Sequence, residues 1–253
     1  MVKFGRGAFH ASGCVLLAAS LLLVLPSQAD ASDRPMETIY DFYLGGIKAG
    51  EVSIDADFKG ERYTARSVLK TAGIVGFVYK ASFEAETEGT LIDGGMSPSR
   101  FAADSRMSKK RQWVEMIYTD DAPKTVNAKP AFVEKSYQVD PAAQTGTLDP
   151  ISAAISALAP MPRERICNRS VEVFDGRRRY AIDLGEPIVD GKRTKCGALY
   201  RRIAGFKPKM MKKRPEFPFW VWFEDRPDGL AHIVRAAGDS MFGLAVILMR
   251  EDR

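Results

Sequence analysis

The side chains that most often carry catalysis are scarce in this sequence. Beyond residue 29 the chain has a single histidine, His232, which lies in a strand-like run and faces the same side as Leu230 and Val234. A nucleophilic triad needs a base beside its nucleophile, and the sequence contains neither a G-x-S-x-G elbow nor an H-E-x-x-H helix. We therefore interpret His232 as a packed or surface residue and expect no catalytic residue.

Acidic residues offer a second route to chemistry. Glu84, Glu86 and Glu88 alternate along one segment, and this alternation is typical of the polar face of a strand. A carboxylate pair of the kind that hydrolyses glycosides stays open at this point, so a hydrolase is our third hypothesis for the function. Zinc sites need several Cys or His ligands, which this chain does not offer, and we expect neither a metal nor a cofactor.

Two cysteines, Cys167 and Cys196, follow residue 29. An even number of cysteines in an exported chain favours a disulfide. If the Asp-Gly pairs at 175–176 and 190–191 are both two-residue hairpin turns, the cysteines lie on two strands that flank a third, about 10 Å apart. A disulfide needs Cα atoms within about 7 Å. Either the segment around Cys167 leaves the sheet or the second turn is a wider loop, and we favour the wider loop.

The first 29 residues have the three parts of a secretory signal peptide. Lys3 and Arg6 give a positive start, residues 14–25 are apolar, and small residues precede Ala29. The apolar run is shorter than the roughly 20 residues that span a bilayer. We expect cleavage near Ala29, with Ala31 as the second choice, a flexible tail over residues 30–36 and a location in the periplasm.

Composition narrows the class of protein further. The 253 residues are 45% hydrophobic and 10% aromatic, which is enough for a core and argues against disorder. Loss of residues 1–29 lowers the formal charge from +5 to +3. So mild a charge excludes a nucleic acid as the expected partner.

Alternation of apolar and polar residues is the main pattern along the chain. Every second residue of Glu51–Phe58 is apolar, and Phe83–Leu91 alternates similarly. Such segments are strands with one apolar and one polar face, as in antiparallel sheets. Similar runs predict strands at Thr38–Leu44, Tyr63–Thr71, Arg100–Arg106, Trp113–Tyr118, Arg178–Leu184, Ala198–Ile203 and Leu230–Ala236.

One helix is predicted in the middle of the chain. Asp149 and Pro150 are an N-cap followed by proline at the first helical position. Ile151–Leu158 is apolar on most sides, so we expect it to pack against the sheet. The fold class is therefore mostly β, with a strongly curved antiparallel sheet or half-barrel that wraps one short helix. Residues 37–253 form a single domain in this interpretation.

Two late strands are apolar on both faces. Phe219 and Phe223 share one face of Phe217–Phe223, Trp220 and Trp222 share the other, and Phe242–Leu248 is similar. Such strands need cover on both sides, from the helix on one face and from a layer, ligand or partner on the other. The two tryptophans fit a core and an apolar ligand groove equally well. We take Trp220, Trp222, Phe219 and Phe223 as candidate ligand-binding residues.

Three basic runs stand out. We interpret Lys109–Arg111 as a solvated hairpin tip, and the arginines 177–179 follow an Asp-Gly turn. The third run precedes the strand that is apolar on both faces, and it has methionines at positions 210 and 211. A cationic loop of this kind could contact anionic lipid headgroups at a membrane surface, or a flexible partner; a solvated loop is the alternative. Its basic residues are Lys207, Lys209, Lys212, Lys213 and Arg214.

Several segments across the mature chain resemble a family of bacterial exported proteins, the domain of unknown function DUF3108. They are Tyr40–Gly46, Lys48–Glu51, Leu148–Ser152, Val173–Tyr180, Lys195–Arg202 and Phe217–Phe223. The resemblance implies a curved antiparallel sheet that cradles a helix, similar in architecture to periplasmic lipoprotein carriers. It implies a role in the cell envelope and transfers no catalytic residue.

The leading functional hypothesis is a non-catalytic periplasmic protein that binds an apolar ligand in or on the curled sheet. The ligand would be a lipid, an acyl chain or a peptide. The alternative is an envelope-integrity scaffold that docks another envelope protein and takes no small ligand. The sequence determines neither the oligomeric state nor the closure of the sheet into a barrel.

Overall fold

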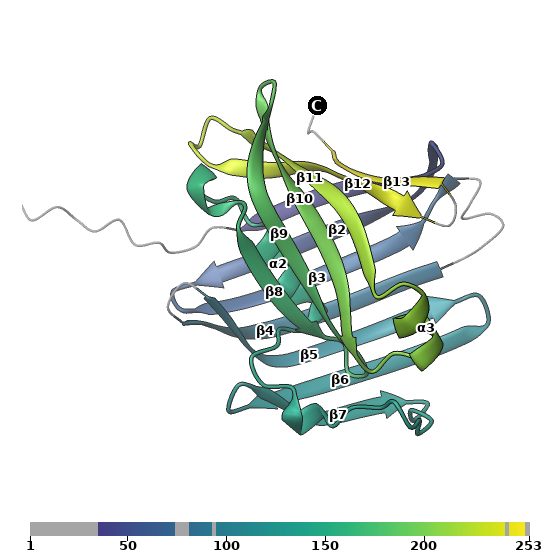
Figure 1. Ribbon diagram of the computed structural model, residues 1–253. Coiled ribbons are helices and arrows are strands. Elements are labelled where there is room, and N and C mark those ends of the chain that lie inside the picture. Colours follow the sequence, from purple (N-terminus) through teal and green to yellow (C-terminus); the bar gives the residue numbers. More distant parts are fainter. Residues whose placement is uncertain (1–34, 74–80, 93–94, 241–242, 251–253) are drawn as a thin grey trace, which may run out of the picture. The chain divides into compact units, whose positions relative to one another are not determined.

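Antiparallel strands make up most of the chain that the computed structural model describes (Figure 1). The described residues are 35–73, 81–92, 95–240 and 243–250, and they belong to one compact unit, residues 31–253. The predicted leader and residues 30–34 of the predicted tail lie outside the described residues. No helix among the described residues is long and apolar enough to cross a membrane.

The first half of the chain is a meander in which each strand pairs with the next. Its strands are β1 (Met36–Leu44), β2 (Ile47–Lys59), β3 (Arg62–Thr71), β4 (Ala81–Ile92), β5 (Gly95–Met107), β6 (Lys110–Thr119) and β7 (Ala122–Lys129).

The second half is a meander of the same kind that follows the helix α2 (Pro150–Leu158). Its strands are β8 (Arg169–Phe174), β9 (Arg179–Asp190), β10 (Arg193–Ala204), β11 (Glu216–Asp225), β12 (Ala231–Ser240) and β13 (Gly243–Met249). The connections hold the 3₁₀ turns η1 (Pro141–Ala143) and η2 (Arg163–Arg165) and the short helix α3 (Pro208–Lys213).

Pairing of β1 with β13 joins the two meanders into one sheet. Tyr40 lies opposite Met249, and the strand order is β7-β6-β5-β4-β3-β2-β1-β13-β12-β11-β10-β9-β8. The sheet is not closed, because β7 and β8 are its two edges. Leu148 covers part of the β8 edge: its amide donates to the carbonyl of Glu172 at 2.9 Å, and its carbonyl accepts from Phe174. The predicted mostly β fold with a curved sheet is confirmed as this open, curved form.

The predictions from sequence missed two strands, β7 and β8. In the turn before β7, Asp120 and Asp121 both have positive φ, at 51° and 57°, which suits a tight hairpin. Pro123 argued against a strand, but β7 is an edge strand, where proline needs no ladder partner. Strand β8 is only six residues long and lacks a clear alternation of polar and apolar residues.

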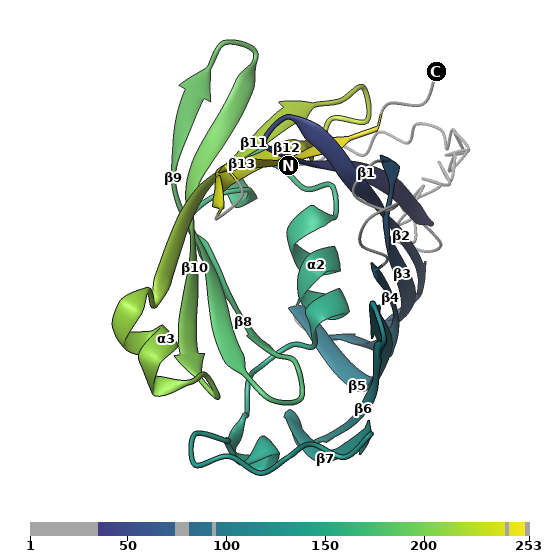
Figure 2. The ribbon, with the colours of Figure 1, turned by 90° about the vertical axis from the view of Figure 1, so that its right-hand side faces the viewer.

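Helix α2 lies inside the curve of the sheet and contacts both halves of it (Figure 2). Asp149 caps the helix, with Oδ1 accepting from the amides of Ile151 and Ser152 at 2.8 and 3.0 Å. Ile151 and Ile155 are buried against β3, β4, β5 and β8. The predicted cap, helix and packing are therefore confirmed.

Two groups of buried side chains form the core on the inner face of the sheet. One surrounds α2 and includes Phe101, Met116 and Phe174. The other surrounds the disulfide and includes Tyr40, Val221 and Phe223. Because the inner face of a strand repeats every second residue, the strand residues of both groups come from the alternating apolar positions of the sequence; Ile151 and Ile155 of α2 join the first group.

Candidate functional site

A cleft of about 670 Å³ lies on the inner face of β4, β5 and β6, opposite the turn between β8 and β9. Ligand pockets in proteins typically measure about 300–1,000 Å³. The apolar residues of its lining come from the inward-facing positions of the three strands, from the segment after β7 and from the first residue of α2. They are Phe83, Phe101, Ala103, Met107, Val114, Pro130, Phe132 and Pro150.

Strand pairing explains why these apolar side chains meet in the cleft. Phe83 lies opposite Ser105, and Ala103 lies opposite Val114. Directly opposed residues of an antiparallel pair point to the same face, so the alternation of each strand produces one continuous apolar surface. Phe101 is 2% exposed at the deep end of this surface.

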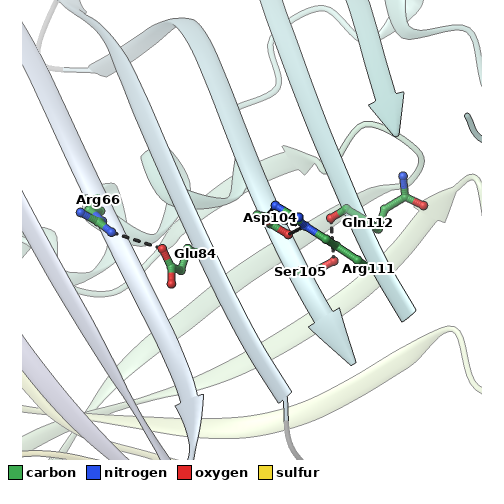
Figure 3. Close-up of polar contacts among 6 residues, drawn as sticks. All are labelled: Arg66, Glu84, Asp104, Ser105, Arg111 and Gln112. Carbon is green, nitrogen blue, oxygen red and sulfur yellow. Dashed lines mark hydrogen bonds and ion pairs between the residues drawn. The ribbon is translucent and has the colours of Figure 1, made fainter. Parts of the chain in front are cut away.

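Basic side chains complete the lining. Lys109, Lys110 and Arg111 come from the turn and the first residues of β6, and Arg177 and Arg178 come from the β8–β9 turn. Arg111 is neutralised, because its guanidinium bonds the carboxylate of Asp104 with Nε at 3.0 Å from Oδ1 (Figure 3). The run Lys109–Arg111 lies at the predicted hairpin tip and, in addition, lines the cleft.

The two arginines of the β8–β9 turn are held in place by their backbone. Oδ1 of Asp175 accepts from the amides of Arg177 and Arg178, each at 2.9 Å. Gly205 has a φ of +80°, and a Cβ at this position would lie 2.1 Å from the carbonyl oxygen of Arg177. This close approach locks the turn against the end of β10. Burial raises the pKa of Asp175, although the charge of Arg178 and the two amides favour the carboxylate.

Aromatic rings hold the side chains of the same arginines. The guanidinium of Arg177 lies 4.7 Å from the ring centre of Phe132, and that of Arg178 lies 5.6 Å from the ring centre of Phe206. Cation–π contacts of this type are worth about 0.5–2 kcal/mol, more where the cation is desolvated. The arginines are thus oriented at the cleft by aromatic rings, and neither forms an ion pair among the described residues.

The third basic run is a helix rather than the predicted loop. Pro208–Lys213 form α3, and all five predicted basic residues, Lys207 to Arg214, are exposed. Arg202 donates to the carbonyls of Met210 and Arg214 at 3.2 and 2.7 Å, which satisfies groups left free at the end of the helix. None of the five basic residues forms an ion pair within the described part of the chain.

The four predicted ligand-binding residues of β11 lie on opposite faces of the sheet. Phe219 and Phe223 belong to the inner face and pack in the second core group. Trp220 and Trp222 point outward, and Trp220 is 41% exposed. Lys195 lies 5.0 Å from the ring centre of Trp220, and Arg235 lies 4.7 Å from that of Trp222.

Of the layer, ligand or partner expected over the outer face of β11, the described part of the chain supplies no layer. No described element covers the two tryptophans; instead the basic side chains of the neighbouring strands lie over their rings. None of the four residues lines the cleft on β4–β6. The structure separates this predicted site from the cleft.

Cys167 and Cys196 form the predicted disulfide, with Cα atoms 5.8 Å apart. Our preference for a wider second turn was wrong. Asp190 pairs with Arg193 across a two-residue turn, and Cys196 lies opposite Pro187. Cys167 instead precedes β8, and Asn168, with a φ of +53°, turns the chain away from the sheet. The two turn residues are Gly191 and Lys192 and not Asp190 and Gly191, so the partner of Cys196 differs by two positions from the register that we assumed.

The sequence of residues 39–249 matches the family described as "Protein of unknown function (DUF3108)". The chain belongs to this family. The resemblance noted from the sequence is therefore confirmed. Among solved structures, the chain is similar to a β-barrel-like protein of the domain of unknown function DUF1849 from Brucella abortus, with 10% identity and a TM-score of 0.45; the match covers 86% of this chain and 96% of that chain. No curated protein matches.

The remaining candidate residues of this DUF3108 protein have structural partners. Nε2 of His232 lies 2.8 Å from Oδ2 of Asp228. Glu84 pairs with Arg66 at 3.2 Å (Figure 3), and Glu86 pairs with Arg100 at 2.9 Å. These glutamates belong to the polar face of β4, as predicted. The described residues contain no group of three or more His, Cys, Asp or Glu side chains that could hold a metal ion.

Sequence reasoning missed the cleft and the polar cluster beneath it. Alternation placed Phe83 on an apolar face, but it could not show that the two halves of the sheet leave space between them. The cluster joins Asp149 to Thr87 at 2.8 Å and Tyr63 to Ser152 at 2.8 Å. These groups are buried and mutually bonded, so we assign them to anchoring α2 and not to the site.

Proposed function

We propose that this DUF3108 protein is a non-catalytic protein of the cell envelope that holds an apolar ligand in the cleft on the inner face of its curled sheet. One observation carries the proposal: a cleft of about 670 Å³ whose deep wall is apolar, formed by Phe83, Phe101, Ala103 and Val114. Apolar concave surfaces of this size are the usual sites of small-molecule binding. The predicted leader supports export, and the envelope role follows from that prediction.

The test fills the cleft with a bulky side chain. Ser105→Trp places an indole on the inner face of β5, where Ser105 lines the cleft. Arg106→Trp is the matched control, because Arg106 is the next residue on the same strand and points to the opposite face. The neutral fluorescent probe N-phenyl-1-naphthylamine reports occupancy of apolar sites.

We expect the wild type and the Arg106→Trp variant to bind the probe, and the Ser105→Trp variant to lose at least tenfold in affinity. Native mass spectrometry of the purified protein should show a small-molecule adduct that the Ser105→Trp variant lacks. Equal probe binding by both variants would refute the proposal, provided that circular dichroism shows both variants to be folded.

The exposed outer face favours a second candidate function, the scaffold that docks another envelope protein. Trp220 and Trp222 lie there, and Arg235 separates Trp222 from Leu248. Trp222 also donates to the carboxylate of Asp190 in the β9–β10 hairpin, in which Val189 is 79% exposed. A scaffold should depend on this face and not on the cleft. Replacement of both tryptophans by alanine would then impair cellular resistance to detergents, whereas Ser105→Trp would leave it unchanged; the carrier function predicts the reverse.

A further inference from the structure

The mouth of the cleft carries more positive charge than its acidic residues balance. Lys109, Lys110, Arg177 and Arg178 line it and form no ion pair with any acidic side chain among the described residues. The one acidic residue of the lining is Asp175. Its Oδ1 already accepts two backbone amides, so it serves the turn that presents the arginines.

Two arginines on the outer face of the sheet have carboxylate partners. Arg100 bonds both Glu86 and Glu115, at 2.9 and 3.0 Å, and Arg201 pairs with Asp183 at 3.1 Å. Arg235, in contrast, lies over the ring of Trp222 on the outer face and forms no ion pair among the described residues. The arginines of the β8–β9 turn also lack an ion pair, and they differ from Arg235 in that they line the apolar cleft.

The position of Arg177 suits it to bind an anion. Its backbone is fixed by Asp175, and its guanidinium lies on the ring of Phe132 at the cleft. A guanidinium on an apolar surface has lost part of its hydration, and charge interactions strengthen as the local dielectric falls. Its planar donors match the two oxygens of a carboxylate or phosphate. Arg178 and Lys110 add charge within the same lining.

We infer that the ligand is an anionic amphiphile, with its alkyl chain against Phe83, Phe101 and Val114 and its carboxylate or phosphate at Arg177 and Arg178. The inference rests on the proposed function, because it assumes that the cleft binds an apolar chain. Neither part of the lining would suffice alone: an inorganic anion would leave the apolar wall exposed, and an alkane would leave the cations unpaired.

The test compares amphiphiles that share one chain and differ in the headgroup. The assay measures displacement of N-phenyl-1-naphthylamine from the full chain at pH 7.5. The four competitors are dodecanoate, dodecyl phosphate, dodecanol and dodecyltrimethylammonium. We expect the two anions to displace the probe at concentrations at least tenfold below that of dodecanol, and the cation to be weaker than dodecanol. The ratio of dodecanoate to dodecyl phosphate distinguishes a fatty acid from a phosphate-bearing lipid.

Charge variants localise the effect. The double variant Arg177→Gln/Arg178→Gln should reduce the preference for anions to less than threefold and leave displacement by dodecanol unchanged. Lys212→Gln/Lys213→Gln is the control, because it removes two exposed cations of α3 that lie outside the cleft lining, and it should keep the preference.

Three results separate the possible failures. Equal displacement by dodecanol and the two anions would overturn the headgroup assignment and leave the apolar site standing. Loss of the preference in the α3 control to the same extent would also overturn it, because net charge alone would then explain the binding. If no amphiphile displaces the probe, or if Ser105→Trp has no effect on displacement, the proposed function itself fails.

Discussion

Removal of the Cys167–Cys196 disulfide should destabilise the protein by about 3.6 kcal/mol. The bridge closes a loop with a sequence separation of 29 residues, and the loop-closure relation gives about 12 cal/mol/K of lost entropy in the unfolded chain, or about 3.6 kcal/mol at 25 °C. For a domain of this size each kcal/mol lowers the melting temperature by about 2–4 °C. We therefore expect a decrease of about 7–14 °C.

The assay compares oxidised and reduced wild type in guanidinium chloride, with tryptophan fluorescence as the signal. This pair has identical side chains, so the difference isolates the crosslink, whereas Cys167→Ala/Cys196→Ala also removes packing of the buried Cys196. The free energy of unfolding must be extrapolated for each form, because a crosslinked unfolded chain exposes less surface and lowers the slope. A reduced protein within about 1 kcal/mol of the oxidised one would refute the entropic argument.

Three other predictions concern the helix cap and the leader. Asp149→Ala should destabilise the protein by about 2–4 kcal/mol, because it removes an N-cap and the buried hydrogen bonds that the hydroxyls of Thr87 and Ser152 donate to the carboxylate; urea unfolding measures this. Burial raises the pKa of Asp149, so the folded state holds its proton more tightly, and this residue's contribution to stability falls as pH rises from about 4 through the raised pKa. Asp149→Asn should remove that pH dependence while it preserves the cap. Sequencing of the protein exported to the periplasm should find its first residue directly after Ala29.

Each of these predictions has an outcome that contradicts it. An alanine variant as stable as the wild type would show that other groups satisfy the helix end. If unfolding curves of the Asp149→Asn variant and the wild type differ by the same amount at pH 4 and pH 7, the buried carboxyl does not titrate as stated. An intact N-terminus in the periplasmic fraction, or no protein there, would contradict the leader.

The candidate site was only partly predictable, and its residues show why. The sequence identified the basic residues 177 and 178 and the apolar face that contains Phe83, but these lie far apart along the chain. Only the approach of the β8–β9 turn to β4–β6 makes them one lining. Conversely, the sequence placed Phe219 and Trp220 on opposite faces of one strand, but it could not show that neither residue lines the cleft.

By itself the sequence determined what depends on local geometry. A strand repeats every two residues, so alternation fixed most of the strands, and Asp149 with Pro150 fixed where α2 begins, because a cap is satisfied within one turn of helix. The tertiary structure decided what depends on contacts between distant residues. These are the pairing of β1 with β13, the choice of the inward face of each strand, the position of Cys167 outside the sheet, and the cleft. Alternation shows that a strand has an apolar and a polar face. Which side chains line the buried interior depends on how the whole sheet curves.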